Sequence, residues 1–267
     1  MQPHAAHGLN GYLSQFLSEE PIVFPPLKWA GGKRWFVNQY ADSFPKWSAK
    51  YYEPFFGSGA AFFHLSPEES VLGNVNSELI KTYRVIRENW REVHTELETH
   101  QAKHSKSHYY KVRDIDGGSR FEKAARFIYL NRTFWNGLYR VNLAGEFNVP
   151  KGTKTSVILE TDNFAGIASR LKRATLLIRD FEEVLDQAGA DDFAFIDPPY
   201  TVKHNYNGFI KYNEKLFSWD DQVRLRDAVV RATNRGVKML ITNANHASVR
   251  KLYENVGSKN EKGANGN

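Results

Sequence analysis

The most chemically specific motif of the sequence is Asp197-Pro198-Pro199-Tyr200, which directly follows the apolar segment Phe193–Ile196. One reaction that this motif suits is methylation of the amino group of an adenine. The amino nitrogen of an adenine ring is a poor nucleophile because its lone pair is delocalised into the ring, so it must be held in place to attack a methyl group. The Asp197 carboxylate and the Pro198 carbonyl can accept its two hydrogens, while Pro199 stiffens the turn. Tyr200 can stack on a base that has left the double helix. An ordinary turn is the less favoured interpretation, because two prolines and a carboxylate follow a buried strand.

A second motif, Glu53–Gly59, reads Glu-Pro-Phe-Phe-Gly-Ser-Gly and ends a β-rich segment. Glycine has no Cβ, so Gly57 and Gly59 let the backbone approach a ligand closely. The motif lacks the three-glycine spacing of a dinucleotide site, which argues against NAD. A tight turn from strand to helix is the alternative interpretation.

The third motif, Lys28–Lys33, places a ring, two glycines and two cations close together. Trp29 can cover the adenosine or the methionine end of a cofactor, and Lys33 can pair with a carboxylate. A surface turn whose lysines extend toward solvent is an equally favoured interpretation.

The fourth motif interleaves arginines, asparagines and aromatic residues over Tyr129–Arg140 and continues in Glu146–Pro150. Arginine suits a guanine edge and asparagine suits an adenine edge. An aromatic side chain can occupy the space that a flipped base leaves. A structural aromatic cluster with solvated arginines is the alternative.

Five short β-rich segments end where polar, glycine or proline residues begin, which is typical of buried parallel strands whose carboxyl ends carry a site. These segments are Tyr51–Phe56, Ser70–Leu72, Thr175–Ile178, Asp192–Ile196 and Val237–Ile241. Helical patterns lie between them at Ala60–Leu65 and Trp219–Thr233, and Ser218 has the character of an N-cap for the latter. The alternation predicts an open α/β sheet.

From Ser77 to about Asn148 the pattern is instead helical and charged, with Phe121–Leu130 as a clear amphipathic helix. A helical block that interrupts an α/β pattern predicts an inserted subdomain.

The chain has 267 residues, 41% of them hydrophobic, which suffices for one large domain with or without a smaller insertion. The absence of cysteine excludes a disulfide scaffold and a thiolate metal site, and it fits a reducing cytoplasm. No apolar segment is long enough to span a membrane, and the start of the chain lacks a secretory pattern. The net charge of +6 favours a polyanionic partner. We interpret Met1–Glu20 and Ser258–Asn267 as tails.

The four motifs, in this order, resemble the Dam-like family of DNA adenine-N6 methyltransferases, the D12 class, over roughly Pro25 to Val256. The resemblance implies an α/β Rossmann-like methyltransferase sheet with an inserted helical target-recognition domain. It places tails at 1–24 and 258–267, an S-adenosylmethionine-binding catalytic domain at 25–76 and 158–257, and the target-recognition domain at 77–157. It implies methyl transfer to an adenine flipped out of double-stranded DNA, with GATC as the expected site.

The resemblance also assigns roles to single residues. Asp197, Pro198, Pro199 and Tyr200 form the catalytic motif. The residues expected at S-adenosylmethionine are Trp29, Lys33, Glu53, Phe55, Gly57, Gly59, Asn74, Asp180, Phe181 and Asp197. The residues expected at DNA are Lys28, Trp135, Asn136, Leu138, Arg140 and Pro150.

Two departures from the family pattern support a second hypothesis, a weakened or silent DNA-binding remnant. Asn74 stands where the family usually has an Asp that accepts hydrogen bonds from the ribose hydroxyls, so we expect weaker cofactor binding. Family members also usually continue past the position of Val256 with a final pair of strands. We therefore expect a monomer with an open sheet edge that a partner can cover.

Other hypotheses concern the acceptor and a metal. RNA adenine, cytosine N4 or a protein amide are alternative acceptors, although the interleaved fourth motif favours duplex DNA. The enzyme can accompany a restriction enzyme, belong to a phage or act alone. His100, His104 and His108 are spaced by four, as in some metal sites, but we favour a solvated helix face and expect no metal. The sequence shows no nucleophile elbow, which argues against a hydrolase.

Overall fold

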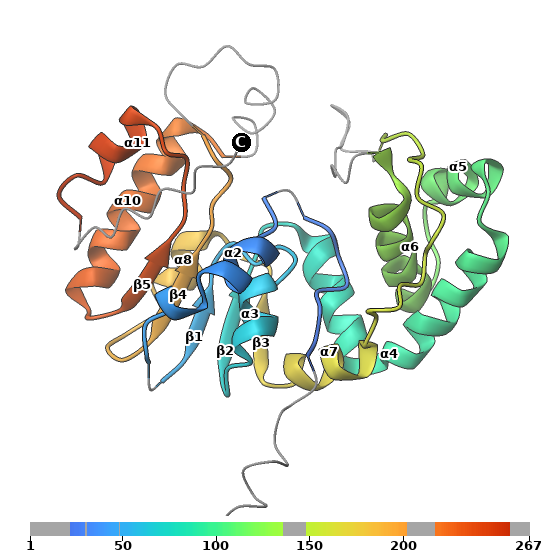
Figure 1. The fold of residues 1–267 in the computed structure, drawn as a ribbon, viewed down its shortest axis with the longest axis horizontal. Helices are drawn as coiled ribbons and strands as arrows, with labels where there is room; N and C mark the ends of the chain where they lie inside the picture. The colour runs from blue at the N-terminus through green and yellow to red at the C-terminus, as the bar shows by residue number, and fades with distance from the viewer. Residues whose placement is uncertain (1–21, 30, 48, 136–147, 202–216, 257–267) are drawn as a thin grey trace, which may run out of the picture.

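The computed structural model describes residues 22–29, 31–47, 49–135, 148–201 and 217–256 (Figure 1). Within them, parallel strands form one five-stranded sheet in the order β3-β2-β1-β4-β5. The strands are β1 (Tyr51–Glu53), β2 (Ser70–Gly73), β3 (Ala174–Leu177), β4 (Phe193–Ile196) and β5 (Lys238–Ile241). The strand order reverses between β1 and β4, which is the switch point where open α/β sheets bind their ligands. The predicted fold class is confirmed.

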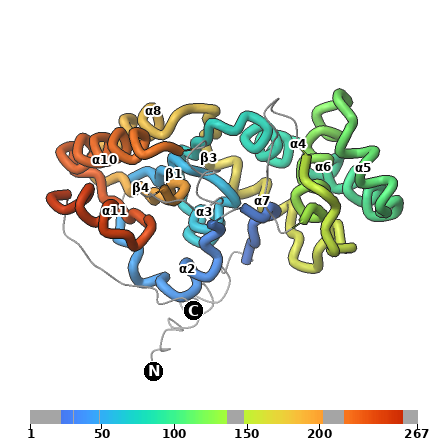
Figure 2. The backbone as a smooth tube through the Cα atoms, turned by 90° about the horizontal axis from the view of Figure 1, so that it is seen from above, coloured from blue at the N-terminus to red at the C-terminus, as the bar shows by residue number. Residues whose placement is uncertain are grey.

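The helices of the described residues separate into two groups. Those around the sheet are α2 (Arg34–Gln39), η1 (Ala41–Ser43), α3 (Ala60–Leu65), α7 (Phe164–Leu171), α8 (Phe181–Leu185), α10 (Trp219–Asn234) and α11 (Ala247–Leu252). Those inserted between β2 and β3 are α4 (Ser77–Lys103), α5 (Lys106–Asp114) and α6 (Arg120–Thr133). Figure 2 shows α5, α6 and the end of α4 standing beside the sheet with its covering helices.

Successive strand residues point to opposite sides of the sheet, and every residue of β1, β2 and β4 is buried, so both faces of these strands are covered. Tyr51, Phe193 and Phe195 belong to a core that includes residues of α3, α4, α6 and α7. Ala194 and Ile196 belong to a second core, shared with α8 and α10. This double burial explains the nearly continuous apolar segments of the sequence.

The predicted elements differ from the observed ones mainly at their ends. Strand β1 stops at Glu53 rather than Phe56, because Pro54 has no N–H with which to extend the ladder. Helix α3 has the predicted limits, and Ser218 is confirmed as the N-cap of α10, where its hydroxyl accepts from the Asp221 N–H at 3.1 Å.

The N-terminal segment is packed at one point that the sequence did not suggest. Val23, inside the predicted tail, is buried, and a Cβ on Gly166 of α7 would lie 2.7 Å from its methyl group. Met1–Glu20 and the predicted tail at 258–267 lie outside the described residues.

Helix α4 connects the sheet to the helical block through a kink at Asn89, whose φ of −142° and ψ of 46° are not helical. Before the kink, Tyr83 and Ile86 are buried in the core beside the sheet, and after it Val93 and Leu97 are buried in the helical block. The Arg120 guanidinium at the start of α6 donates to the Asn89 side chain at 2.8 Å, which holds the kink against α6.

A buried arginine joins the far end of α6 to the chain around the sheet. Arg132 is 1% exposed and makes two hydrogen bonds of 2.6 Å with the Asp162 carboxylate. It also donates to the backbone carbonyls of Pro26 and Val157. A buried guanidinium with this many acceptors has the satisfied geometry that such a charge requires.

We expect Arg132→Met to lower the free energy of unfolding by about 3–5 kcal/mol, because it leaves the Asp162 carboxylate and the Pro26 carbonyl buried without their donor. Urea denaturation followed by circular dichroism measures the change. As a control, Arg226→Met removes a surface ion pair with Asp227 and should cost less than about 1 kcal/mol. Equal losses in the two variants would contradict this role of Arg132.

Candidate functional site

The switch point of the sheet brings the first two motifs together. Strands β1 and β4 are neighbours, paired Tyr51 with Phe193 and Tyr52 with Ala194. The carboxyl ends of parallel strands lie at the same edge, so the segment that begins at Glu53 and the Asp197 motif meet there.

Asp197 is held by residues from two other segments. The Lys33 ammonium lies 2.6 Å from its Oδ1 atom, and the Thr242 hydroxyl, just after β5, donates to the same oxygen at 2.5 Å. Lys33 also donates to the Gly31 carbonyl at 2.8 Å and lies 4.8 Å from the centre of the Tyr200 ring. The Asp197–Tyr200 motif and the Lys28–Lys33 motif therefore share one polar cluster.

The two charges of this cluster stabilise each other inside the protein. The Lys33 side chain is 6% exposed and that of Asp197 is 19% exposed. Burial opposes the charge on Lys33, but Asp197 and Tyr200 outweigh it and raise its pKa above the ordinary value. Burial raises the pKa of Asp197, while the Lys33 ammonium and the Thr242 hydroxyl counteract part of that rise.

Glu53 is a second buried carboxyl group, on the neighbouring strand end. It is 4% exposed and accepts a hydrogen bond of 2.7 Å from the Tyr51 hydroxyl. Burial raises its pKa to about 8, the nearby Asp197 charge adds to the rise, and the Tyr51 hydroxyl and the Phe62 backbone N–H oppose it. Glu53 is therefore mainly protonated at neutral pH in this structure, whereas Asp197 is paired with a cation.

The glycine loop after β1 is in close contact with its surroundings. A Cβ on Gly57 would lie 2.4 Å from the Trp29 indole, and Gly59 has a φ of +74° that favours glycine. The buried Tyr83 hydroxyl of α4 donates to the carbonyls of Gly57 and Ser58, at 3.3 and 3.0 Å. These contacts bring Trp29 and the loop together, as a shared ligand site requires.

Asn74, just after β2, ties two loops together. Its amide nitrogen donates to the Phe56 carbonyl at 3.1 Å, and its amide oxygen accepts from the Asn76 N–H at 2.7 Å. A carboxylate can make the second contact but cannot donate to a carbonyl. The asparagine thus positions the glycine loop, a role separate from the expected contact with ribose.

Asp180 and Phe181, expected at the cofactor's adenine, begin α8. The Asp180 carboxylate caps the helix by accepting from the Glu182 N–H at 3.0 Å, and it also accepts from the Arg224 guanidinium at 2.9 Å. Phe181 is stacked on Phe55 at 5.2 Å, and Arg224 lies 4.9 Å from the Phe181 ring centre. The structure therefore places Phe55, Asp180 and Phe181, all expected at the cofactor, side by side. The two phenylalanines pack in the core that the sheet shares with α8 and α10.

Three of the residues expected at DNA lie around the last turn of α6. Lys28 exchanges two backbone hydrogen bonds of 2.8 Å with the Asn131 side chain. The Trp135 side chain is 51% exposed, and the backbone N–H of Trp135 donates to the Pro150 carbonyl at 3.0 Å. Within the fourth motif, Asn131 and Arg132 are buried structural residues and Trp135 is an exposed one. The remaining expected residues, Asn136, Leu138 and Arg140, lie outside the described residues.

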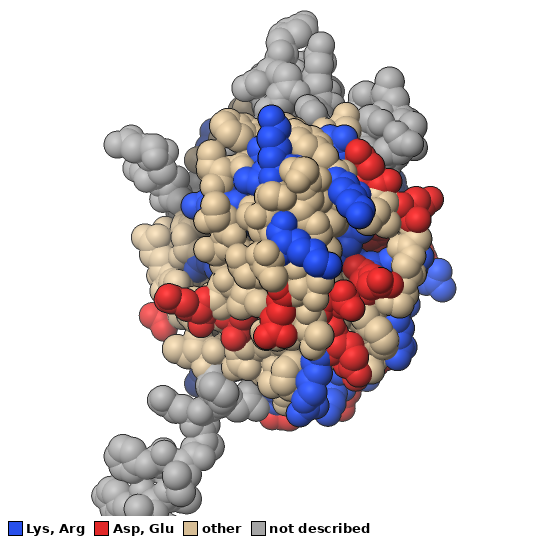
Figure 3. All heavy atoms as spheres, turned by 90° about the vertical axis from the view of Figure 1, so that its right-hand side faces the viewer, with Lys and Arg blue, Asp and Glu red and all other residues tan. Residues whose placement is uncertain are grey.

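The side of the molecule formed by the helical block carries charges of both signs. Figure 3 shows several Lys and Arg side chains over its upper half, Asp and Glu side chains across the middle and at the upper right, and further Lys and Arg side chains at the bottom. Burial and the nearby charges of Lys154, Arg132 and Arg34 lower the pKa of Lys28, as repulsion among cations requires. A concentration of cations near the end of α6 suits a polyanionic partner.

The three spaced histidines surround Tyr129 in the helical block. The ring nitrogens of His100 and His108 lie 3.1 Å apart, and His104 lies 2.9 Å from the Tyr129 hydroxyl. Burial and the nearby charges of His108 and Lys103 lower the pKa of His100 to about 4. Within the described residues, no three His, Asp or Glu side chains, these histidines included, are arranged so that they could hold a metal ion. No helix among the described residues combines the length and apolar character needed to cross a bilayer.

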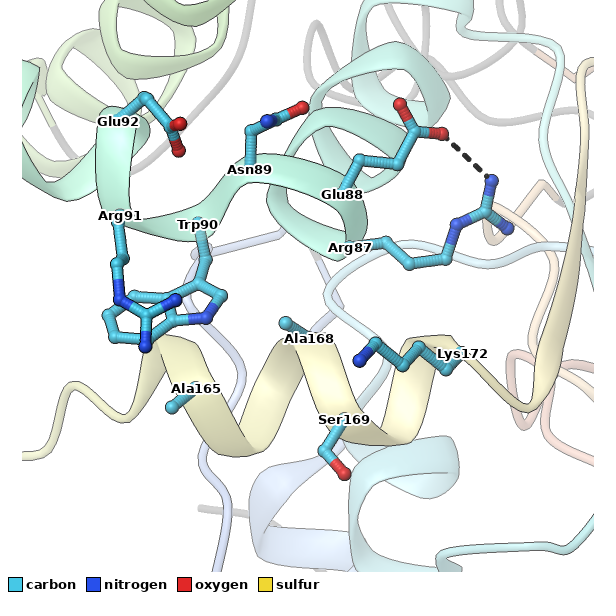
Figure 4. A pocket seen from close by; sticks show the side chains of 10 residues that line it. All are labelled: Arg87, Glu88, Asn89, Trp90, Arg91, Glu92, Ala165, Ala168, Ser169 and Lys172. Atoms are coloured by element: carbon cyan, nitrogen blue, oxygen red, sulfur yellow. Dashed lines mark hydrogen bonds and ion pairs between the residues drawn. The ribbon is translucent and has the colours of Figure 1, made fainter.

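A separate pocket of about 260 Å³ lies at the kink of α4, against α7. Figure 4 shows the Arg91 guanidinium stacked on the Trp90 ring, 4.5 Å from its centre. Arg87 and Lys172 line the pocket together with acidic side chains, so its lining carries charges of both signs. None of the four motifs contributes a residue to it.

The motifs of the sequence predict no role for Thr242 or Arg224. Thr242 directly follows the predicted strand Val237–Ile241, and the carboxyl ends of parallel strands carry the site, so its position in the sequence could have indicated a role there. Arg224 lies within a charged helix, and nothing in its local sequence distinguishes it from a solvated residue.

Comparisons with known proteins point to one family. A family model described as D12 class N6 adenine-specific DNA methyltransferase matches residues 29–265. A type II methyltransferase of Lactococcus lactis subsp. cremoris is 36% identical, over 86% of this chain and 84% of the relative. A type II methyltransferase of Methanocaldococcus jannaschii is 34% identical, over 89% of this chain and 90% of the relative. A DNA adenine methylase of Vibrio cholerae is 30% identical, over 85% of this chain and 83% of the relative.

Glu53 leads to a prediction about stability and pH. Its folded-state pKa of about 8 lies above the ordinary value of 4.5, so the folded chain holds a proton that the unfolded chain has released. Stability from this proton is complete below about pH 4.5 and is lost as the pH rises toward 8. Relative to Glu53→Gln, the wild type should lose up to about 1.4 kcal/mol per pH unit between roughly pH 5.5 and 7.5.

Chemical denaturation at a series of pH values measures this difference. The exposed Glu69→Gln exchange makes the same chemical change at the surface and should leave the slope unchanged. Parallel pH profiles for wild type and Glu53→Gln would show that Glu53 is ionised in the folded chain.

Proposed function

Because this chain belongs to the D12 class of N6 adenine-specific DNA methyltransferases, we propose that its methyl donor is S-adenosylmethionine and its acceptor is an adenine turned out of duplex DNA. The observation that carries this proposal is the position of Asp197. Its carboxylate is paired with Lys33 at the switch point of the sheet, and Asp197 directly follows β4, the neighbour of the strand β1 that leads into the glycine loop.

The proposed donor site is built from groups that suit S-adenosylmethionine. Gly57 has no Cβ, which lets the Trp29 indole lie directly against the glycine loop. Lys33 supplies a buried cation for a carboxylate, and Phe181 with Phe55 supplies flat apolar rings for an adenine. When bound, S-adenosylmethionine supplies a methyl group already activated on a sulfonium, so the protein's contribution is positioning and electrostatics.

The proposed acceptor site is formed by the Asp197–Tyr200 motif. The Asp197 carboxylate and the Pro198 carbonyl accept the two hydrogens of the adenine amino group, which directs the nitrogen lone pair out of conjugation with the ring. Tyr200 is 37% exposed, so its ring is accessible for stacking on the extruded base. Because these acceptors are already in position, no solvent has to reorganise around the amino group during the reaction, and this lowers the barrier.

The proposed DNA contacts come from the end of α6 and the segments tied to it. Lys28, Trp135 and Pro150 gather there, and we extend the assignment to Asn136, Leu138 and Arg140 of the same motif. The helical block, at 77–157, acts as the target-recognition domain. GATC is the sequence we propose, resting on the resemblance at the base-reading positions.

Asn74 favours a second candidate, a remnant that binds DNA but transfers methyl groups weakly, because its amide accepts a ribose hydrogen bond without charge assistance. Titration calorimetry with S-adenosylmethionine separates the two. Binding at micromolar concentration supports the enzyme, and absence of binding at millimolar concentration supports the remnant.

We expect Asp197→Ala to abolish methylation of duplex DNA while DNA affinity changes by no more than a few fold. Transfer of tritiated methyl groups and fluorescence anisotropy measure the two quantities. Asp197→Ala leaves Lys33 buried without its partner, so Asp197→Asn is tested beside it as a variant that keeps the shape. Asp227→Ala, at an exposed position on α10, is the matched control.

Methylation at the wild-type rate in a folded Asp197→Ala variant would remove the mechanism. Activity on RNA or protein but not on duplex DNA would show that the proposed acceptor is wrong, while the proposed role of the Asp197 carboxylate would stand.

A further inference from the structure

The two oxygens of the Asp197 carboxylate have different surroundings. Oδ1 lies 2.6 Å from the Lys33 ammonium and accepts the Thr242 hydroxyl at 2.5 Å. No donor within the described residues forms a hydrogen bond with Oδ2. A carboxylate held through one oxygen by two donors has a restricted rotation about its last bond, so the direction of the other oxygen is also restricted.

The parallel ladder places Thr242 beside Asp197. Strands β4 and β5 pair with Ile196 opposite Ile241, and the next backbone hydrogen bond runs from the Thr242 N–H to the Ile196 carbonyl at 3.0 Å. Residues 197 and 242 are therefore the next neighbours in register, about 5 Å apart across the sheet. Because threonine is branched at Cβ, its hydroxyl also has few rotamers.

A pair of amides holds the segment that carries Thr242. Asn243 and Gln222 exchange hydrogen bonds of 3.2 and 3.4 Å between their side chains, and Gln222 is 0% exposed within α10. The Asn243 oxygen also accepts from the Ala244 N–H at 2.8 Å. The chain after β5 is thus tied to a core helix directly next to Thr242.

We propose that Thr242 is a positioning residue, which fixes the Asp197 carboxylate so that Oδ1 faces Lys33 and Oδ2 faces the methyl acceptor. The inference rests on the proposed function for the identity of that acceptor. The Thr242 hydroxyl donates to a carboxylate and so favours its ionised, hydrogen-bond-accepting form. Lys33 compensates the negative charge of the Asp197 carboxylate, and Thr242 fixes the orientation of that carboxylate.

The test compares Thr242→Val, which keeps the shape and removes the donor, with Thr242→Ser, which keeps the donor. In single-turnover methylation of duplex DNA, the valine variant should be slower by about 10- to 100-fold, the loss expected for one hydrogen bond to a charged group. Dissociation constants for DNA and S-adenosylmethionine should stay within about threefold, because the hydroxyl acts on orientation rather than on binding. The serine variant should recover most of the rate.

The pH profile separates positioning from a general loss of structure. Without the hydroxyl the pKa of Asp197 rises, so the acid limb of the rate profile of Thr242→Val should move toward higher pH by about one unit, whereas that of Thr242→Ser should not. Thr233→Val is the matched control, because its hydroxyl donates to the Val229 carbonyl within α10. A wild-type rate, or an unshifted acid limb, in the valine variant would overturn the role of Thr242.

Carbon-13 NMR titration of the Asp197 carboxyl group keeps this inference separate from the proposed function. If wild-type protein methylates no DNA, the proposed function fails. The titration still decides whether Thr242→Val raises the Asp197 pKa, and an unchanged value would refute the contact.

Discussion

The pairing of β4 with β1 on one side and β5 on the other is the constraint on which the site depends. In a parallel sheet the carboxyl ends of neighbouring strands share one edge, and the ladder fixes their offset. This pairing brings Asp197 next to the glycine loop after Glu53 and next to Thr242. Lys33 then reaches the same carboxylate from outside the sheet. The site is therefore assembled from the ends of β1, β4 and β5, which the ladder positions, and from the Lys33 side chain, which comes from outside the sheet.

The two carboxyl groups of this edge are both buried but have different partners. Glu53 has a hydroxyl and a backbone N–H as partners, and burial with the charge of Asp197 raises its pKa to about 8. Asp197 has an ammonium, which compensates part of the cost of burying its charge. Pairs of titratable groups whose environments separate their pKa values are typical of sites that use one group as an acceptor and keep the other neutral. Here we propose Asp197 as the acceptor.

The helical block and the sheet are connected at both ends of α6. Arg120 holds its start to the kink of α4, and the buried Arg132 ties its last turn to Asp162 and Pro26. Trp135 follows directly and is exposed. A rigid connection of this kind transmits the position of the sheet to the segment proposed to contact DNA, because a buried, fully bonded guanidinium tolerates little displacement.

The sequence by itself determined the elements whose signals are local. Apolar segments ending in polar residues identified the strands, and Asp197–Tyr200 identified the chemistry, because these patterns extend over a few neighbouring residues. Only the tertiary structure decided that Thr242 bonds a carboxylate 45 positions away, or that Arg132 is buried rather than solvated. It also showed that the Asn74 amide donates to a carbonyl 18 positions away. Such contacts depend on strand order and register, and the local sequence of either partner carries no trace of the other.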